Sequence, residues 1–270
     1  AIITDMIDYG SSASVGSAVA ALEQVGADRL RETLRSLDGQ DPDSSDIGQA
    51  LGRWWEPLQV DAPEAISGRM GVERFEVPEW SGWLTSAQID GRMVPPGAYT
   101  RLVEAVPGGD RLLWMSDTPS EILDTLPFVW SAHGRVVILG LGLGMVPRLL
   151  AAMPDVTAVD VIETDADVIA LTSPDDPKIA VHHGDAFDEQ LAARIRPDGG
   201  WDVALYDIWP DIGPGIRSDA ARLAGLWPAA ATTVWALDHW AAEEARLAAD
   251  FGVPVAEVRR VADLTAGAGR

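Results

Sequence analysis

The stretch VVILGLGLGMVPRLL, residues 136–150, decides how this chain is interpreted. Its first four residues form a short, β-branched apolar run without alternation, which is typical of a strand buried on both faces. Three glycines follow, Gly140, Gly142 and Gly144, and a helical pattern then begins. Because glycine has no Cβ atom, such a loop lets a ligand lie against the backbone at the start of the helix. The alternative is a tight turn in which glycine serves only packing.

From residue 134 onward, strand-like and helix-like segments alternate. The strand-like segments are RVVILG (135–140), VTAVDVIE (156–163), KIAVHHGD (178–185) and WDVALYD (201–207). This alternation predicts an α/β fold: a Rossmann-like, open and mainly parallel sheet with helices on both faces. The stretch TTVWALDHWAAEEARLAAD (232–250) is compatible with a further strand or with a helix. Alanine and glutamate dominate from residue 241 onward, which favours a mostly helical stretch.

The chain before this alternation has a different character. Residues 1–68 carry helical patterns, whereas short β-like runs punctuated by glycine and proline follow. A helix is expected over 118–132, where Thr118 and Glu121 have the spacing of a capping box. We therefore expect an N-terminal helical region (1–68), a small β region with a lead-in helix (69–130), and a Rossmann-like domain (131–270).

Composition excludes several classes of function. The chain has 270 residues, no cysteine and a formal net charge of −22, which excludes disulfides, thiolate nucleophiles and cysteine-ligated zinc. A strongly negative field repels polyanions, so we expect no nucleic-acid partner. No apolar run approaches the roughly 18 residues of a membrane span, and the start lacks a signal-peptide pattern, so we expect a cytoplasmic protein. His182 and His183 point to opposite faces of one strand, and we predict no metal site.

Each of the last three strand-like segments ends in an acidic residue: Glu163, Asp185 or Asp207. In an open parallel sheet, ligands bind at these carboxyl ends. Glu163 comes about 20 residues after the glycine loop, the offset at which an acid binds a ribose diol. The loop lacks both the third glycine of a dinucleotide fingerprint and the Gly-Lys-Ser/Thr of a Walker loop. A cationic adenosine derivative therefore suits this edge better than a pyrophosphate does.

These motifs together resemble the class I S-adenosylmethionine-dependent methyltransferase superfamily. VVILGLGLG resembles its first motif, VDVIETDADVIAL its second strand and helix, and VHHGDAFD its third. The residues of the second and third motifs are also similar to those of the spermidine synthase-like branch. The chain departs from that branch at Leu143, where the branch's Gly-Gly-Gly-Asp-Gly loop has an acid, and it has no match to the branch's Tyr-His-Glu segment.

The resemblance implies a role for each candidate residue. It implies S-adenosyl-L-methionine as cofactor, with Gly140, Gly142 and Gly144 under its methionine and ribose parts. It further implies that Glu163 holds the ribose hydroxyls and that Thr164 or Asp165 lies beside the adenine. Asp185 would accept from the adenine amino group, and Ala186 or Phe187 would pack on the ring. Asp207 and Trp209 would face the transferred group.

Three functions are compatible with this assignment. Our main prediction is an S-adenosylmethionine-dependent methyltransferase acting on a small-molecule or protein acceptor. Asp207 is the candidate base or orienting group, Asp211 the second choice, and Trp209 either shapes the acceptor pocket or simply packs beside the loop. The alternatives are an aminopropyl (spermidine synthase-like) transferase and a non-catalytic Rossmann-like cofactor-binding module. The acceptor and the oligomeric state do not follow from the sequence.

Overall fold

The computed structural model describes residues 58–60, 62–78, 97–209, 213 and 215–260. The chain divides into two compact units. The first comprises Ala1–Ser131, Gly142–Met153 and Ala170–Pro174, and the second comprises Ala132–Leu141, Pro154–Ile169 and Asp175–Arg270. No helix within the described ranges is long and apolar enough to cross a membrane. The N-terminal helical region expected over 1–68 lies mostly outside the described residues.

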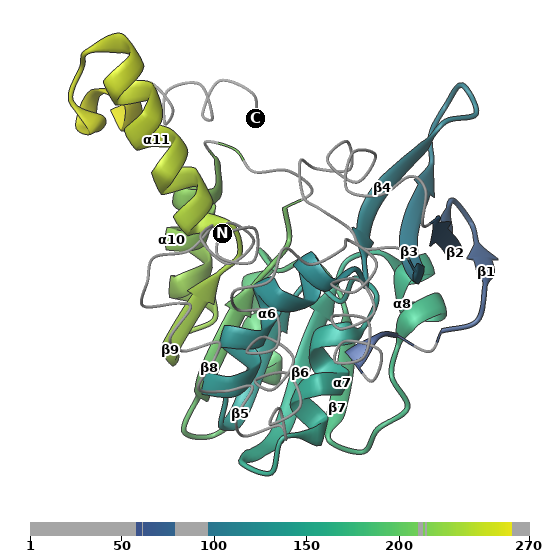
Figure 1. Ribbon diagram of the computed structural model, residues 1–270. Helices are drawn as coiled ribbons and strands as arrows, with labels where there is room; N and C mark the ends of the chain where they lie inside the picture. Colours follow the sequence, from purple (N-terminus) through teal and green to yellow (C-terminus); the bar gives the residue numbers. More distant parts are fainter. Residues whose placement is uncertain (1–57, 61, 79–96, 210–212, 214, 261–270) are drawn as a thin grey trace, which may run out of the picture. The chain divides into compact units, whose positions relative to one another are not determined.

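The second unit contains a five-stranded parallel sheet. Its strands are β5 (Gly134–Leu139), β6 (Val156–Glu163), β7 (Ile179–His183), β8 (Trp201–Tyr206) and β9 (Ala229–Val234). They lie in the order β7-β6-β5-β8-β9, so β5 is central (Figure 1). The last four residues of β5 are each 0–1% exposed, as their unbroken apolar run predicts. The Rossmann-like parallel sheet flanked by helices is therefore confirmed.

Helices α9 (Glu189–Ile195) and α10 (Gly215–Leu226) pack on one face of this sheet. The core on that face joins Leu139 and Tyr206 from the strands to Leu191, Leu223 and Trp227. The Tyr206 hydroxyl donates a hydrogen bond of 2.8 Å to the Trp227 carbonyl oxygen, so this buried polar group is satisfied. Helix α8 (Ala166–Thr172) follows β6, and α11 (Leu237–Phe251) follows β9.

The stretch 232–250 contains both of the elements that its sequence left open. Residues Thr232 to Val234 belong to β9 and pair with Ala204 to Tyr206 of β8, and most of the remaining stretch is helical, as its composition favoured. The helix begins only at Leu237, after Ala236 adopts a left-handed backbone with φ 57°. The Thr-Thr-Val run is β-branched and suits a strand, whereas the alanine-rich and glutamate-rich part that follows forms the helix.

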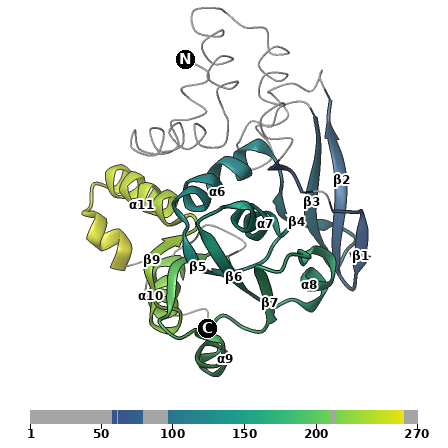
Figure 2. The same cartoon turned by 90° about the horizontal axis from the view of Figure 1, so that it is seen from below.

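Among its described residues, the first unit contains a four-stranded antiparallel sheet and two complete helices. Its strands are β1 (Ala65–Ser67), β2 (Met70–Val77), β3 (Gly97–Ala105) and β4 (Arg111–Ser116), in sequential order (Figure 2). Strand β1 precedes residue 69, where the β region was expected to begin. The helices are α6 (Pro119–Ser131) and α7 (Met145–Ala152).

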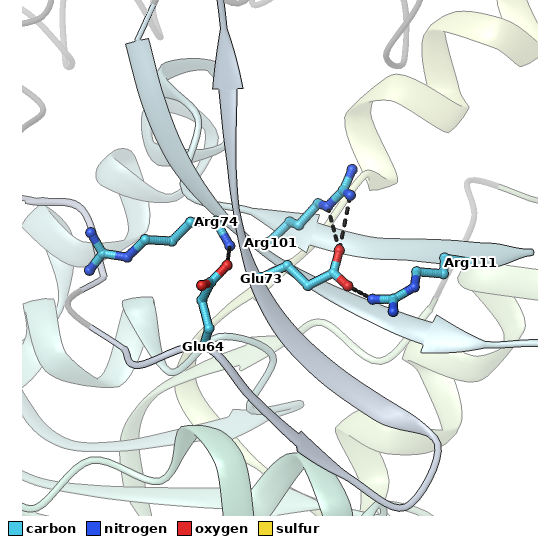
Figure 3. A network of polar contacts seen from close by, with 5 residues as sticks. All are labelled: Glu64, Glu73, Arg74, Arg101 and Arg111. Carbon is cyan, nitrogen blue, oxygen red and sulfur yellow. Dashed lines mark hydrogen bonds and ion pairs between the residues drawn. The ribbon is translucent and has the colours of Figure 1, made fainter.

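A charged cluster links three strands of this sheet (Figure 3). Glu73 on β2 lies opposite Arg101 on β3 and accepts hydrogen bonds of 3.2 and 2.9 Å from its Nε and Nη2 atoms. Glu73 also forms an ion pair with Arg111 on β4. The next residue, Arg74, points its side chain to the other face, while its backbone N–H donates to Glu64 across 2.9 Å. Because successive side chains of a strand point to opposite faces of the sheet, Glu73 and Arg74 lie on different faces.

The start of α6 is joined to the end of β4 through Glu121. The Glu121 carboxylate accepts from the backbone N–H of Ser116 at 2.8 Å and from its hydroxyl at 2.6 Å. Ser116 lies two residues before Thr118, the cap residue that the spacing indicated. The acid at the expected position therefore ties the helix to the end of β4.

Asp117, between β4 and α6, joins two other segments. Its carboxylate is fully buried and accepts from the backbone N–H groups of Val60 at 3.0 Å and Thr100 at 2.6 Å. Burial raises the pKa of Asp117 above its ordinary value, while these backbone hydrogen bonds act to lower it. The carboxylate thus anchors the segment before β1 to β3.

Candidate functional site

The carboxyl ends of four neighbouring parallel strands form the candidate site in the second unit. Following the sheet order, β7 leads into Asp185, β6 ends at Glu163, β5 leads into Gly140, and β8 leads into Asp207. Parallel strands point their carboxyl ends toward the same edge of a sheet. The fold therefore presents three carboxylates and a glycine at one edge, as the strand-end pattern predicted.

Glu163 joins two of these ends. Its Oε2 atom accepts from the backbone N–H of Leu141 at 2.9 Å, and its Oε1 atom accepts from the N–H of Asp165 at 2.8 Å. The side chain is half-buried. Each carboxylate oxygen has two lone pairs, so both oxygens keep acceptor capacity for a hydroxyl group.

Asp165 has a structural role that the sequence did not indicate. Its Oδ1 atom accepts from the N–H of Asp167 at 2.8 Å and of Val168 at 3.4 Å, which caps the first turn of α8. Thr164 is exposed, and its carbonyl oxygen lies 3.1 Å from the Nε2 atom of His183. These contacts neither support nor contradict the predicted position of Thr164 and Asp165 beside an adenine ring.

The three residues after β7 divide between the edge and the core. Asp185 is exposed and accepts from the N–H of Phe187 at 2.8 Å, a local turn that keeps its carboxylate at the edge. Ala186 is buried, and its carbonyl oxygen accepts from the Trp227 indole N–H at 2.6 Å. Phe187 is half-buried, with the Arg222 guanidinium 4.7 Å from its ring centroid. The carboxylate of Asp185 thus keeps capacity for another donor.

The residues after β8 include the candidate catalytic groups. The backbone N–H of Asp207 donates to the Leu139 carbonyl at 2.9 Å, so Asp207 extends the pairing of β8 with β5. The Trp209 indole donates to Asp219 of α10 at 3.2 Å and packs against the sheet core. That contact fits the packing alternative for Trp209. Asp211 lies outside the described residues.

All three glycines of the loop closely approach protein atoms. In the second unit, Gly140 has φ 101°, and a Cβ atom there would collide with the Asp207 carbonyl oxygen. In the first unit, Gly142 has φ 52° and faces the Met115 sulfur, and Gly144 has φ 70° and faces the Thr172 carbonyl oxygen. Packing and backbone conformation therefore account for all three glycines. Their contact with a ligand stays a prediction.

Two residues at the loop were not predicted from the sequence. The backbone N–H of Leu143 donates to the Sδ atom of Met115 at 2.9 Å, and the Arg148 Nη1 atom donates to the Leu143 carbonyl at 3.0 Å. Met115 lies 28 residues earlier on β4, in an apolar strand pattern that carries no functional signal. Only the fold brings this thioether to the loop.

His182 belongs to a polar group inside the second unit. Its Nε2 atom lies 3.0 Å from Oδ1 of Asp160, and Oδ2 of Asp160 accepts from the Trp201 indole N–H at 3.0 Å. Over the described part of the chain, no three histidine, cysteine, aspartate or glutamate side chains are grouped as metal ligands would be. His182 is thus used in packing the sheet.

The fold is of the Rossmann-like class, and the edge described above is where that class binds its ligands. No protein-family model matches the chain. A stretch of 104 residues, 34% of this chain, is 33% identical to Polyamine aminopropyltransferase 2 of Streptomyces coelicolor. That stretch covers 18% of the relative, so the chain spans less than a fifth of the length of the curated protein that it matches.

Two solved structures are also similar over part of their length. Spermidine synthase from Thermotoga maritima matches with 15% identity and a TM-score of 0.30, over 40% of this chain and 43% of that one. A spermidine synthase in complex with the transition state analogue AdoDATO gives the same identity and TM-score, over 40% and 44% of the two chains. A TM-score of 0.30 is too low for either structure to support a conclusion about this chain.

The sequence similarity corrects our main functional prediction. We expected a methyltransferase that uses S-adenosyl-L-methionine, and the curated relative is instead an aminopropyltransferase. The methyltransferase prediction and its cofactor are therefore wrong, and the finding supports the alternative named beside them. The motifs shared by the two groups explain the error, because they describe where an adenosine sulfonium binds rather than which group leaves it.

Proposed function

We propose that this protein is an aminopropyltransferase that uses decarboxylated S-adenosylmethionine as donor and a small amine as acceptor. The observation that carries the proposal is the 33% identity over 104 residues to a polyamine aminopropyltransferase. It agrees with the resemblance of the second and third sequence motifs to the spermidine synthase-like branch. The acidic edge of the parallel sheet supports the same donor on independent, electrostatic grounds.

The charge of the edge suits this donor. Decarboxylated S-adenosylmethionine carries a sulfonium and an ammonium group but no carboxylate, so both of its charges are positive. The strand ends offer Glu163, Asp185 and Asp207, and the described residues 140–141, 163–165, 184–188 and 207–209 include no basic side chain, while Arg222 of α10 lies against the Phe187 ring. Opposite charges attract more strongly near a protein surface than in bulk water. A donor that also carried a carboxylate would be repelled in part by the same groups.

Each edge residue has a proposed task. Glu163 accepts from the ribose hydroxyls with the lone pairs that its two backbone contacts leave over. Asp185 accepts from the adenine amino group, and the Phe187 ring packs on the base. Asp207 orients the attacking amine and takes up the proton that it loses. The exposure of Asp185 and the half-buried position of Phe187 are compatible with these tasks.

The proposed reaction is a displacement at carbon. The amine nitrogen forms a bond to the aminopropyl carbon, the carbon–sulfur bond breaks with its electron pair left on sulfur, and the new ammonium loses one proton. The products are an aminopropylated amine and neutral 5′-methylthioadenosine. The protein's main contribution is alignment of nitrogen, carbon and sulfur, which is worth roughly 7–11 kcal/mol in well-oriented reactions.

Mass spectrometry of products tests the proposal. The chain is incubated with decarboxylated S-adenosylmethionine and, in separate reactions, putrescine, cadaverine and spermidine. We expect at least one amine to gain an aminopropyl group in one-to-one ratio with 5′-methylthioadenosine. Asp207→Asn should slow turnover by about 100-fold or more while leaving donor affinity nearly unchanged. Tight donor binding without product from any amine would contradict the enzymatic part of the proposal.

A further inference from the structure

We infer that β9 (Ala229–Val234) is an association surface, at which two copies of this chain join their parallel sheets edge to edge. The inference does not depend on the proposed transferase activity, and every residue that carries it lies in the second compact unit. Among the described strands, β9 is the outermost member of its sheet, beside β8 (Figure 1). One edge of its backbone therefore faces no other strand of the described part of the chain.

The side chains of β9 are uncovered on both faces of the sheet. The four central residues, Ala230 to Thr233, are all exposed, although successive side chains of a strand point to opposite faces. Only the end residues, Ala229 and Val234, are half-buried, and these two pack against the hydrophobic core of the sheet. A strand that approached the outer edge of β9 would therefore meet exposed side chains on both faces.

The backbone groups at this outer edge follow from the pairing with β8. The N–H of Trp235 donates to the Tyr206 carbonyl oxygen at 2.9 Å, so residue 235 points its polar groups toward β8. Successive residues of a strand point their N–H and C=O groups to alternate sides. Ala230, Thr232 and Val234 therefore point theirs away from β8. Such a row of outward N–H and C=O groups is a template for another strand.

Strand β9 lacks the features that protect the other described edge strands. Charged side chains, bulges and short length all discourage pairing at an edge. Lys178 precedes β7, β4 begins at Arg111 and has a register shift against β3, and β1 has three residues. The β9 sequence AAATTV has no charged residue and no proline, and its register with β8 is continuous. Of these edges, that of β9 is the least protected against association.

The charge of the chain favours a second copy at this edge over contact elsewhere on the surface. The formal net charge is −22, so two copies repel each other wherever their charged surfaces meet. Residues 223–237, which include all of β9, contain no charged residue. Two copies can therefore meet at β9 without placing like charges opposite each other.

An antiparallel pair of β9 strands is self-complementary about a twofold axis. With Thr232 on the axis, its outward N–H and C=O groups bond to those of Thr232 in the second copy, and Ala230 lies opposite Val234. Threonine pairs of this kind stabilise antiparallel strands. The contact of one six-residue strand is small beside the roughly 1,200–2,000 Å² of standard interfaces, so we expect a weak dimer that dissociates on dilution.

Analytical ultracentrifugation of the full chain, from dilute to concentrated protein, tests the inference. We expect the average mass of the wild type to rise with concentration toward that of two chains. Thr232→Lys places two positive charges opposite each other at the axis and should raise the dissociation constant about fivefold or more. Thr232→Glu should do the same with negative charges. An equal mixture of the two variants should restore association, because lysine then lies opposite glutamate.

Two further variants serve as controls. Leu112→Lys adds the same charge at an exposed position of β4, outside the proposed interface, and should leave the dissociation constant unchanged. Thr232→Pro removes only an outward N–H, so it should keep the pairing with β8 and prevent association. Circular dichroism checks that each variant is folded.

Three results would overturn the inference. The first is a wild type that stays a single chain at the highest concentration. The second is a folded Thr232→Lys or Thr232→Pro protein that associates as the wild type does. The third is a mixture of the lysine and glutamate variants that associates no better than either variant alone. None of these results bears on the proposed aminopropyl transfer, which is measured separately.

Discussion

The carboxylate of Glu163 accepts a hydrogen bond from the backbone N–H of Leu141 across 2.9 Å, and so joins the end of β6 to the glycine loop after β5. The other oxygen of the same carboxylate accepts from the N–H of Asp165, at the turn into α8. One side chain thus holds two strand ends in place. An acid at this position therefore serves the fold, in addition to the ligand role that its distance from the loop suggests.

Glu163→Gln should affect stability and donor binding together. The amide keeps one acceptor oxygen, but its N–H₂ group must face one of the two backbone N–H groups that the carboxylate now satisfies. We expect a loss of about 1–2 kcal/mol in the free energy of unfolding. We also expect decarboxylated S-adenosylmethionine to bind about tenfold more weakly. Urea unfolding and titration calorimetry measure the two effects.

Asp188→Asn is the matched control for that change. Asp188 caps α9 by accepting from the N–H groups of Gln190 and Leu191, and asparagine caps helices about as well as aspartate. This acid-to-amide substitution should therefore leave both stability and donor affinity close to wild type. Equal effects of Asp188→Asn and Glu163→Gln would show that loss of one negative charge, rather than the Glu163 contacts, matters.

Gly140→Ala separates close packing from backbone strain. Gly140 has φ 101° and Gly199 has φ 89°, so alanine is strained at both positions by about 1–2 kcal/mol. Only at Gly140 does the new Cβ atom meet the Asp207 carbonyl oxygen, whereas nothing lies within 4 Å of it at Gly199. We expect overpacking to add about 1–3 kcal/mol of destabilisation at Gly140. Equal losses in chemical unfolding of the two variants would contradict this account.

The parallel sheet was predictable because its signals are local. The last four residues of β5 are an unbroken apolar run, β6 ends at the acid Glu163, and β8 is followed directly by the acid Asp207. Strand β9 was not predictable in the same way. Its Thr232–Val234 segment is a strand because β8 offers it a hydrogen-bonding partner, and a window of sequence does not contain that partner.

The site was predictable as a set of strand ends but not as a set of contacts. The sequence places Asp165 beside Glu163, yet the former caps α8 and the latter holds the loop. Both are acids at the same strand end, and only the direction of each carboxylate separates their roles. Met115 had no signal at all, because its contact with Leu143 joins residues 28 positions apart.

Asp160→Ala should destabilise the second unit. Asp160 accepts from the Trp201 indole N–H at 3.0 Å and lies 3.0 Å from His182 Nε2. Trp201 is 3% exposed, so loss of the carboxylate leaves a buried N–H without its acceptor, at a cost of about 1–3 kcal/mol. Trp201→Phe removes that N–H, so we expect a coupling energy of about 0.5–3 kcal/mol in the double-mutant cycle. Strict additivity would show that the Asp160–Trp201 bond contributes nothing to stability.

Asp117 gives a pH dependence whose sign can be worked out. Burial raises the pKa of this carboxyl above its ordinary value of 3.8, and the Val60 and Thr100 N–H groups only oppose that shift. Between the ordinary and the raised pKa, the folded chain holds a proton that the unfolded chain has lost. The contribution of Asp117 to stability therefore falls as pH rises through this window.

Asp117→Asn isolates that contribution, because an amide does not titrate. The variant should be less stable by about 1–3 kcal/mol, since its N–H₂ group faces one of the two backbone N–H donors. Urea unfolding of both proteins between about pH 4 and pH 8 gives the difference in their free energies of unfolding at each pH. We expect the advantage of the wild type to be largest at the acidic end and to shrink as pH rises, because the buried carboxylate then becomes charged. An advantage that grew with pH would mean that the backbone hydrogen bonds outweigh burial and hold the pKa of Asp117 below its ordinary value.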